Sequence, residues 1–314
     1  MTTVPKNQMK PHVIFLPYSG PSAIKTMLKL AELFHYKGLR VTFINTEINH
    51  KRFLESGGPH WLDGSPDFEF RTIPDQPNCI VSSAHSGLQV WNEPETKFLN
   101  YFLDLVTSLP DPPTCIISDG LMSALTVDAA QKLKIPVMLF WPIAACSYMC
   151  FYQSNYLVEK GIVPLKDSSK LTNTSQDTLE KTLDWIPGMK DIRIKDLPSM
   201  AWSDPNGKFS TFINEAAKIS SKVSHNIIHT FDDLESSIVD AFSSMFSSHV
   251  YTVGPLQLLL DQIPKEEKET EESNFNGYSL LKQEPECLQW LGSKKPNSVI
   301  YESLQFCHTN LRSI

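Results

Sequence analysis

Residues 12–38, HVIFLPYSGPSAIKTMLKLAELFHYKG, decide the fold class. The apolar run at 12–17 is typical of a buried strand, and apolar residues recur at helical spacing over 22–37. Ser22 is the expected N-cap of this helix and Gly38 its expected C-terminal stop. Because a buried strand that leads into an amphipathic helix opens a βαβ unit, the stretch predicts an α/β protein with a parallel sheet.

The same alternation continues along the chain. We expect further strands at 40–45, 68–73, 114–118, 137–140, 226–230 and 250–253, with helices at 121–133, 233–245 and 284–291. Residues 68–73 alternate between apolar and polar, which suits a strand near the sheet edge. The pattern as a whole predicts a parallel sheet with helices on both faces.

Composition and charge exclude several classes of protein. The chain has 314 residues, is 41% hydrophobic and 20% charged, and carries a net charge of −7, as in an ordinary soluble protein. Lys and Arg are scattered without a basic stripe, so we expect no nucleic-acid partner. No apolar segment approaches the length of a membrane span or of a signal peptide core, so we expect no membrane partner and a cytoplasmic location.

Neither the cysteines nor the histidines predict a metal site. Six cysteines in a chain of this length do not form a disulfide scaffold, and Cys146 and Cys150, four residues apart, read as buried thiols of a reducing compartment. His225 and His229 share the spacing of a helical metal pair, but they bracket an expected strand and have no third ligand nearby. We therefore expect no metal cofactor.

Two positions in the expected crevice bear on chemistry. Asp119 follows a buried strand and precedes a helix, which places it at the crevice rim, either as an acid that orients a histidine or as the cap of the helix. Ala23 lies just inside the first helix, where a histidine could act as a general base, and it can carry no proton. His85, in a polar loop near the crevice, is a replacement base or a solvated loop histidine.

Aromatic residues gather around Trp141 and Tyr148. At helical spacing they form either core or the lining of a pocket for a flat apolar ligand. Burial is the commoner fate of such residues, so the core interpretation comes first.

A set of short motifs resembles the plant family-1 UDP-glycosyltransferases, in particular the subgroup of 7-deoxyloganetin and cyanohydrin glucosyltransferases. The motifs are KPHVIFLPY (10–18), NTE with NH (45–47 and 49–50), LDG (62–64), TIPD (72–75), ISDG (117–120), FW (140–141), WIPGM (185–189), DLPS (196–199), TF (230–231), GPLQLL (254–259) and ECLQWL (286–291). They are specific in combination and run through nearly the whole chain.

The resemblance implies a GT-B fold, in which an N-terminal Rossmann-like domain holds the acceptor and a C-terminal domain holds the UDP-sugar. It implies inverting transfer of glucose from UDP-glucose to a hydroxyl of a terpenoid, phenolic or cyanohydrin acceptor, without a metal. A histidine takes the acceptor's proton and an aspartate, here Asp119, steadies the imidazolium. The resemblance places Tyr18, Ser19, Trp141 and His85 against the acceptor.

The chain departs from the family's pattern at the base position and at its end. Residues 19–27 read SGPSAIKTM where the family has PAQGHINPM, so Ala23 occupies the base position. After Tyr301 the family's VNFGS is replaced by ESLQF, and the donor-binding signature does not follow. We expect an acceptor domain at 1–256, a charged linker at 257–283, a remnant of the donor domain at 284–314, and a loop at 75–93 shorter than the family's.

From these departures we expect an impaired glucosyltransferase in which UDP-sugar binding is doubtful. Two alternatives stay open. One is a non-catalytic module that binds a small molecule or a relative of this chain, and the other is a truncated gene product. In each case a face that normally meets the donor domain is expected to be exposed and to favour self-association.

Overall fold

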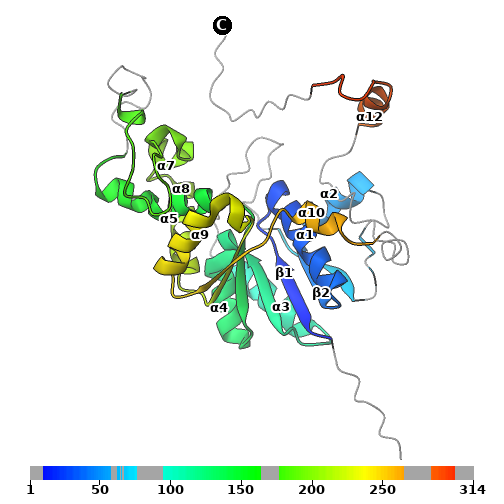
Figure 1. The fold of residues 1–314 in the computed structure, drawn as a ribbon. Helices are drawn as coiled ribbons and strands as arrows, with labels where there is room; N and C mark the ends of the chain where they lie inside the picture. The colour runs from blue at the N-terminus through cyan, green and yellow to red at the C-terminus, as the bar shows by residue number, and fades with distance from the viewer. Residues whose placement is uncertain are drawn as a thin grey trace, which may run out of the picture.

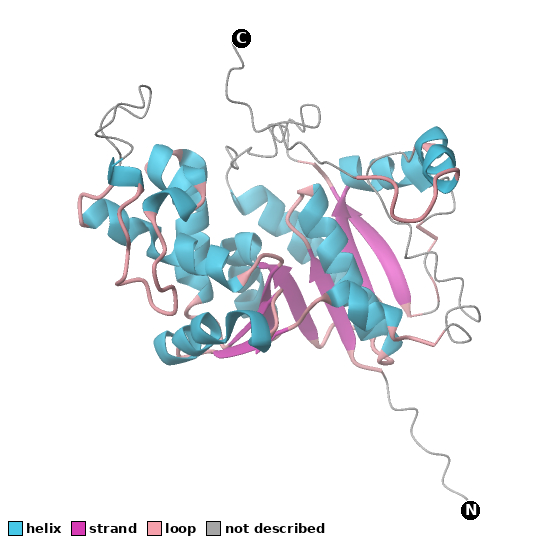
Figure 2. Ribbon diagram, turned by 45° about the horizontal axis from the view of Figure 1, so that its top comes forward, coloured by secondary structure: helices cyan, strands magenta, loops and turns pink. Residues whose placement is uncertain are grey.

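The computed structural model describes residues 10–57, 62–63, 65, 67–75, 95–163, 177–264 and 284–300. Its centre is a seven-stranded sheet in the order β3-β2-β1-β4-β5-β6-β7, with every neighbouring pair parallel (Figure 2). The strands are β1 (His12–Leu16), β2 (Arg40–Thr46), β3 (Phe68–Ile73), β4 (Cys115–Asp119), β5 (Val137–Trp141), β6 (His225–Ile228) and β7 (His249–Thr252). Each predicted strand is confirmed to within two residues, and β3 lies at an edge as expected.

Helices connect these strands in the doubly wound manner (Figure 1). The longer ones are α1 (Pro21–Tyr36), α2 (Glu47–Gly57), α3 (Glu95–Ser108), α4 (Ser123–Leu133), α5 (Ala145–Glu159), α8 (Lys208–Ser220) and α9 (Asp232–Met245). The shorter ones are η1 (Gly120–Met122), η2 (Ile194–Asp196), α7 (Ser199–Ser203), α10 (Leu256–Asp261) and α12 (Pro285–Gly292). The order of strands reverses at β1, whose two neighbours are β2 and β4, and ligands of such sheets bind beyond the carboxyl ends of the strands near this point.

The alternation of β1 shows how the sheet divides two cores. Val13 and Phe15 point to one face, where they pack with apolar residues of α1, α2 and α10. Ile14 and Leu16 point to the other face, where they pack with residues of α3 and α4. Because successive side chains of a strand point to opposite faces, a continuous apolar strand requires cover on both, and the expected helices on both faces are confirmed.

The start of α1 differs from the expectation. The helix begins at Pro21 with Gly20 as the N-cap residue, and no side chain caps it. Ser22 is therefore not the cap: proline takes the first helical position because its φ is preset and it has no N–H to leave unpaired. At the other end Gly38 has φ of 86°, which confirms it as the left-handed stop that a residue with a Cβ rarely adopts.

A third core lies among α5, α8 and α9, at the end of β5. Trp141 is 1% exposed and its ring stacks on that of Tyr148, with centroids 4.2 Å apart and planes at 18°. Gly120 lies against this tryptophan, since a Cβ there would come within 2.2 Å of the indole ring. The core interpretation is confirmed for Trp141 and Tyr148, whereas Tyr156 of the same aromatic group is 44% exposed.

The last described segment contributes nothing to these cores. Helix α12 has no buried residue and lies apart from the sheet in Figure 1, and Ile300 is 94% exposed without regular secondary structure. Tyr301 and His85 fall outside the described residues, as does most of the predicted loop at 75–93. Within the described part, no helix is both long and apolar enough to cross a membrane.

Candidate functional site

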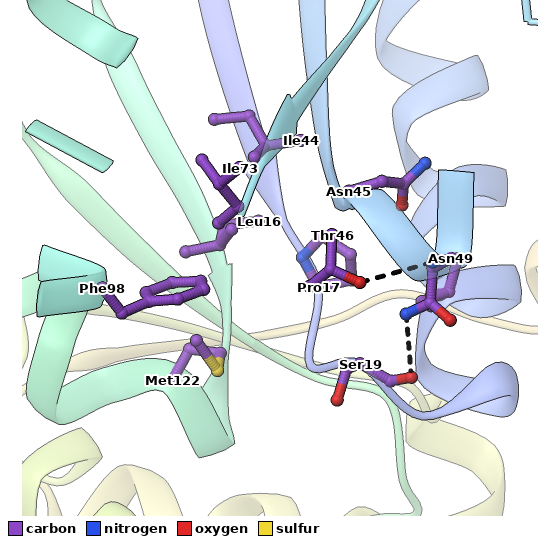
Figure 3. A pocket seen from close by; sticks show the side chains of 11 residues that line it. Leu16, Pro17, Ser19, Ile44, Asn45, Thr46, Asn49, Ile73, Phe98 and Met122 are labelled. Carbon is purple, nitrogen blue, oxygen red and sulfur yellow. Dashed lines mark hydrogen bonds between the residues drawn. The ribbon is translucent and has the colours of Figure 1, made fainter. Parts of the chain in front are cut away.

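A pocket opens at the carboxyl ends of β1, β2 and β3, on one side of the point where the strand order reverses (Figure 3). The free space in and above it is about 290 Å³, a volume that includes open solvent, and its enclosed part has room for about one water molecule. Its apolar wall comes from strand ends and from α1, α3 and η1, and consists of Leu16, Pro17, Ile24, Ile44, Ile73, Phe98 and Met122. A mainly apolar pocket at this edge of a parallel sheet is the ordinary form of a small-molecule site.

The remaining lining of the pocket is polar and uncharged: Ser19, Asn45, Thr46 and Asn49. In Figure 3, Ser19, Asn45 and Asn49 lie apart from the apolar group formed by Ile44, Ile73, Leu16, Phe98 and Met122. The side-chain N–H of Asn49 donates to the Ser19 carbonyl at 3.2 Å, which ties the start of α2 to the loop after β1. The pocket thus has an apolar part and an amide part.

Asp119 lies at the end of β4, on the other side of β1 from the pocket. Its Oδ1 accepts the Leu121 backbone N–H at 2.9 Å and so begins the turn of η1. It is 1% exposed, so it lies at the carboxyl edge of the sheet as expected but is buried there and does not stand at an open rim. This bond makes Asp119 the cap of η1, and its role as the acid partner of a base stays a prediction.

Burial governs the protonation of Asp119. Loss of solvation raises the pKa of this carboxyl, the backbone N–H groups of Leu121 and Tyr18 lower it, and the outcome is about 7. Oδ2 has no partner that meets hydrogen-bond geometry among the described residues, although Tyr18 lies near enough to act on the pKa. Near neutral pH the carboxyl group is therefore partly protonated and partly ionised.

The structure brings together only some of the residues that were predicted to surround the base position. Ala23 is half-buried and packs against the apolar core between β1 and α3, and Ser19 lines the pocket. Tyr18 is 8% exposed and lies in the same core, 6.5 Å from the ring of Phe212. Trp141 lies in the separate core beside α5 and not in the pocket wall.

Sequence reasoning missed Asn45 and Asn49 as site residues. Both belong to motifs that carry the family resemblance, but neither can titrate or act as a nucleophile, so a search for reactive side chains passes over them. The available signal was position: Asn45 follows Ile44 near the end of a buried strand, where a polar residue meets the crevice.

The described residues contain no group of three or more His, Cys, Asp or Glu side chains that could hold a metal. The ring of His225 stacks on that of His249, whereas His229 packs against Phe140, so the two do not act as a pair. Cys150 is buried as expected, and Cys146 is half-buried.

Comparison with known proteins gives a consistent result. The chain is 54% identical to UDP-glycosyltransferase 85C2 of Stevia rebaudiana over all of its length and 64% of that protein's. It is 43% identical to (R)-mandelonitrile beta-glucosyltransferase of Prunus dulcis and 42% identical to 7-deoxyloganetin glucosyltransferase of Gardenia jasminoides, over 93% of this chain and 60% of each relative. No family model matches the sequence.

Solved structures agree in fold. Os79 of O. sativa, in complex with UDP, matches 93% of this chain and 62% of its own with a TM-score of 0.62 at 16% identity. UGT71G1 of Medicago truncatula, complexed with UDP-glucose, matches 79% of this chain and 52% of its own with a TM-score of 0.59 at 20% identity. The fold is that of the Rossmann-like N-terminal domain of GT-B glycosyltransferases. The chain belongs to the plant UDP-glycosyltransferase family and spans 60–64% of the length of these curated relatives.

Proposed function

We propose that this chain provides the acceptor-binding part of an inverting transferase that moves glucose from UDP-glucose to a hydroxyl of a small, largely apolar molecule. The observation that carries the proposal is the 54% identity to a UDP-glycosyltransferase over the whole chain. An apolar pocket at the carboxyl edge of the sheet supports it, because an acceptor of this kind needs such a surface. The relatives named for 7-deoxyloganetin and mandelonitrile suggest terpenoid or cyanohydrin acceptors.

We further propose that transfer by this chain is slow. The acceptor oxygen must lose its proton as it attacks the anomeric carbon, and Ala23 offers no group to receive it. Asp119 does not replace the base, because it is buried and one of its oxygens already accepts the Leu121 N–H.

The test restores the base in a chain that also carries a donor-binding part. Residues 1–256 of this protein are joined to the remainder of the Stevia relative, and glucose transfer from UDP-glucose to a panel of terpenoid and phenolic alcohols is measured. We expect Ala23→His to raise kcat by about 100-fold or more, since general-base catalysis contributes on that scale. Ala23→Ser, which adds a side-chain hydroxyl but no base near neutral pH, is the matched control. Equal rates with alanine and histidine would refute the role of this position.

A second candidate is a module that binds an acceptor-like molecule without turnover, which the burial of Asp119 favours. It predicts ligand-induced stabilisation of the 314-residue chain in the absence of UDP-glucose.

Under either function we propose the division at about residue 256, with 257–283 as a linker and 284–314 as the start of a further part. The lack of any buried residue in α12 supports this division. Self-association and a cytosolic location remain predictions; a concentration-independent monomer on size-exclusion chromatography would contradict the first.

A further inference from the structure

Two histidines lie side by side at the amino end of the last two strands of the sheet. His225 begins β6 and His249 begins β7, and the register of these parallel strands pairs the two residues directly. Their rings stack with centroids 5.3 Å apart and planes at 26°. Because directly paired residues of neighbouring strands point to the same face of a sheet, both imidazoles project from one surface.

This surface is accessible to solvent. Side chains alternate along β7, and Val250 packs against the core among α5, α8 and α9, so His249 and Tyr251 point to the opposite face. His249 is exposed, Tyr251 is 44% exposed and His225 is half-buried. Since β7 also lies at an edge of the sheet, a dissolved ion can reach the two imidazoles.

Tyr251 orients the ring of His225. The hydroxyl of Tyr251 lies 3.3 Å from Nδ1 of His225 and can accept the hydrogen of that nitrogen. In this tautomer the lone pair of the neutral imidazole is on Nε2, which has no hydrogen-bond partner among the described residues. Histidines that bind a metal usually donate their other ring N–H in this way, which fixes the tautomer and the orientation of the ring.

We propose that His225 and His249 together bind a divalent metal ion that prefers imidazole, such as Zn²⁺ or Cu²⁺. Two imidazoles on one tetrahedral ion, with metal–nitrogen bonds of about 2.0–2.1 Å, have ring centres about 5 Å apart. The observed spacing of 5.3 Å matches this distance. The ring of His249 is exposed and can turn about its broad terminal torsion to direct a nitrogen at the ion.

The two histidines act as a chelate. Once one imidazole holds the ion, the second is already in place, so its bond forms at a high effective concentration. Water completes the coordination sphere, because two side chains fall short of the three or four protein ligands of catalytic and structural zinc sites. The site lies at the opposite end of the sheet from the pocket, so it goes beyond the proposed function and does not depend on it.

The test titrates Zn²⁺ into the untagged 314-residue chain at pH 7.5 and follows the imidazole NMR signals of His225 and His249. We expect the signals of both rings to shift together along one binding curve. We expect His225→Gln and His249→Gln each to weaken binding by about tenfold or more, read from the signals of the remaining histidine, because chelation is lost. Tyr251→Phe keeps both ligands and removes only the hydroxyl that orients His225, so we expect it to weaken binding less than either substitution of a histidine.

His35→Gln is the matched control. His35 is also half-buried, but it lies at the end of α1 against the ring of Phe68, near the other edge of the sheet. We expect this variant to keep the wild-type affinity for Zn²⁺. Signals of His225 and His249 that stay in place at millimolar Zn²⁺, or an affinity that neither glutamine substitution at these two positions lowers, would overturn the proposal.

Discussion

Buried polar side chains at the amino end of the sheet have hydrogen-bond partners, whereas some at the carboxyl end lack them among the described residues. At the amino end, the His12 Nε2 lies 2.8 Å from the Thr42 hydroxyl, which donates to Glu69 at 2.8 Å, and the His12 Nδ1 lies 3.1 Å from the Asp111 carbonyl. At the carboxyl end of β2, three residues beyond Thr42, the amide of the equally buried Asn45 has no partner among the described residues.

The difference separates stability from function. A paired polar network stabilises the sheet and fixes its register. An unpaired buried group lowers the stability of the free protein until a ligand supplies the missing hydrogen bond. We call the first region, formed by His12, Thr42, Glu69 and Asp111, the closed end, and the region of Asn45, Asn49 and Asp119 the crevice end. The predictions below test whether polar side chains at the two ends respond in opposite directions.

The largest effect is expected at Asp119. Its folded pKa of about 7 lies above the ordinary 3.8, so the folded protein holds a proton that the unfolded chain releases, and stability falls as pH rises from about 4 to 7. The gap between the two values corresponds to about 4 kcal/mol. Asp119→Asn keeps the acceptor for Leu121 and removes the titration. We expect this variant to gain up to about 4 kcal/mol over the wild type between pH 4 and pH 8, measured by urea unfolding.

The control is Asp128→Asn, which removes an exposed carboxylate on α4 that lies 3.9 Å from the Lys132 ammonium, and we expect it to change the free energy of unfolding by less than about 1 kcal/mol. The same dependence of the unfolding free energy on pH in the wild type and in Asp119→Asn would show that the pKa of Asp119 is not raised. It would also remove the strongest evidence for a difference between the closed end and the crevice end.

A carboxylate with full partners near the crevice end should behave in the opposite way. Glu235 accepts the backbone N–H groups of Ala145 and Cys146, both at 2.8 Å, at the start of α5. Burial raises the pKa of Glu235, but its bonds from Thr230, Cys146 and Ala145 outweigh this and hold the pKa below its ordinary value. We expect Glu235→Ala to lose about 2 kcal/mol at pH 7.5, because two donors of the first turn lose a charged acceptor. Circular dichroism during thermal unfolding measures the loss.

For Glu235 the sign of the pH dependence is the check. A depressed carboxyl pKa contributes stability above the unfolded value and loses it as the pH falls, so the penalty of Glu235→Ala should shrink toward pH 4. A penalty that is the same at both pH values would mean that the carboxylate makes no specific contribution to α5.

The smallest effect is expected at His12. Burial lowers the pKa of this histidine, although the Asp111 carbonyl opposes the change, so the folded protein binds a proton on the ring less tightly than the unfolded chain does. The unfolded chain then binds the extra proton first, and stability is lost as the pH falls below about 6.5. We expect His12→Gln to reduce the loss of unfolding free energy between pH 7 and pH 5 by about 1 kcal/mol or less. A steeper dependence of the unfolding free energy on pH in the variant would contradict the lowered pKa of His12.

Much of the fold could be predicted from the sequence, because its strands are continuous apolar runs with clear ends. None of the helices α2, α3, α5 and α8 was predicted from the sequence. In α5 the buried residues, among them Ala145, Tyr148 and Cys150, leave no single apolar face. The cap at Ser22 was wrong because the local preference of proline for the first helical position outweighs that of serine for the cap.

The candidate site was less accessible to sequence reasoning. The positions of Ala23 and Asp119 could be read from motifs, but the burial of Asp119 depends on where β4 ends relative to its neighbours. The grouping of Asn45 and Asn49 with Phe98 and Met122 depends on four separate segments meeting, which no local pattern encodes. Reactive side chains draw attention in a sequence, whereas unreactive amides show their role only when burial and missing partners are known.

The contrast between the two ends is tested most directly by measuring the free energy of unfolding of Thr42→Val and Asn45→Leu side by side, without ligand, at pH 7.5. Both changes remove buried polar atoms from β2 and keep the branching and the number of heavy atoms of the side chain. The account predicts that Thr42→Val loses about 1–3 kcal/mol, because His12 and Glu69 lose a partner, and that Asn45→Leu gains about 1 kcal/mol. A loss of similar size in both variants would mean that the Asn45 amide is satisfied in the free protein, which would contradict the account.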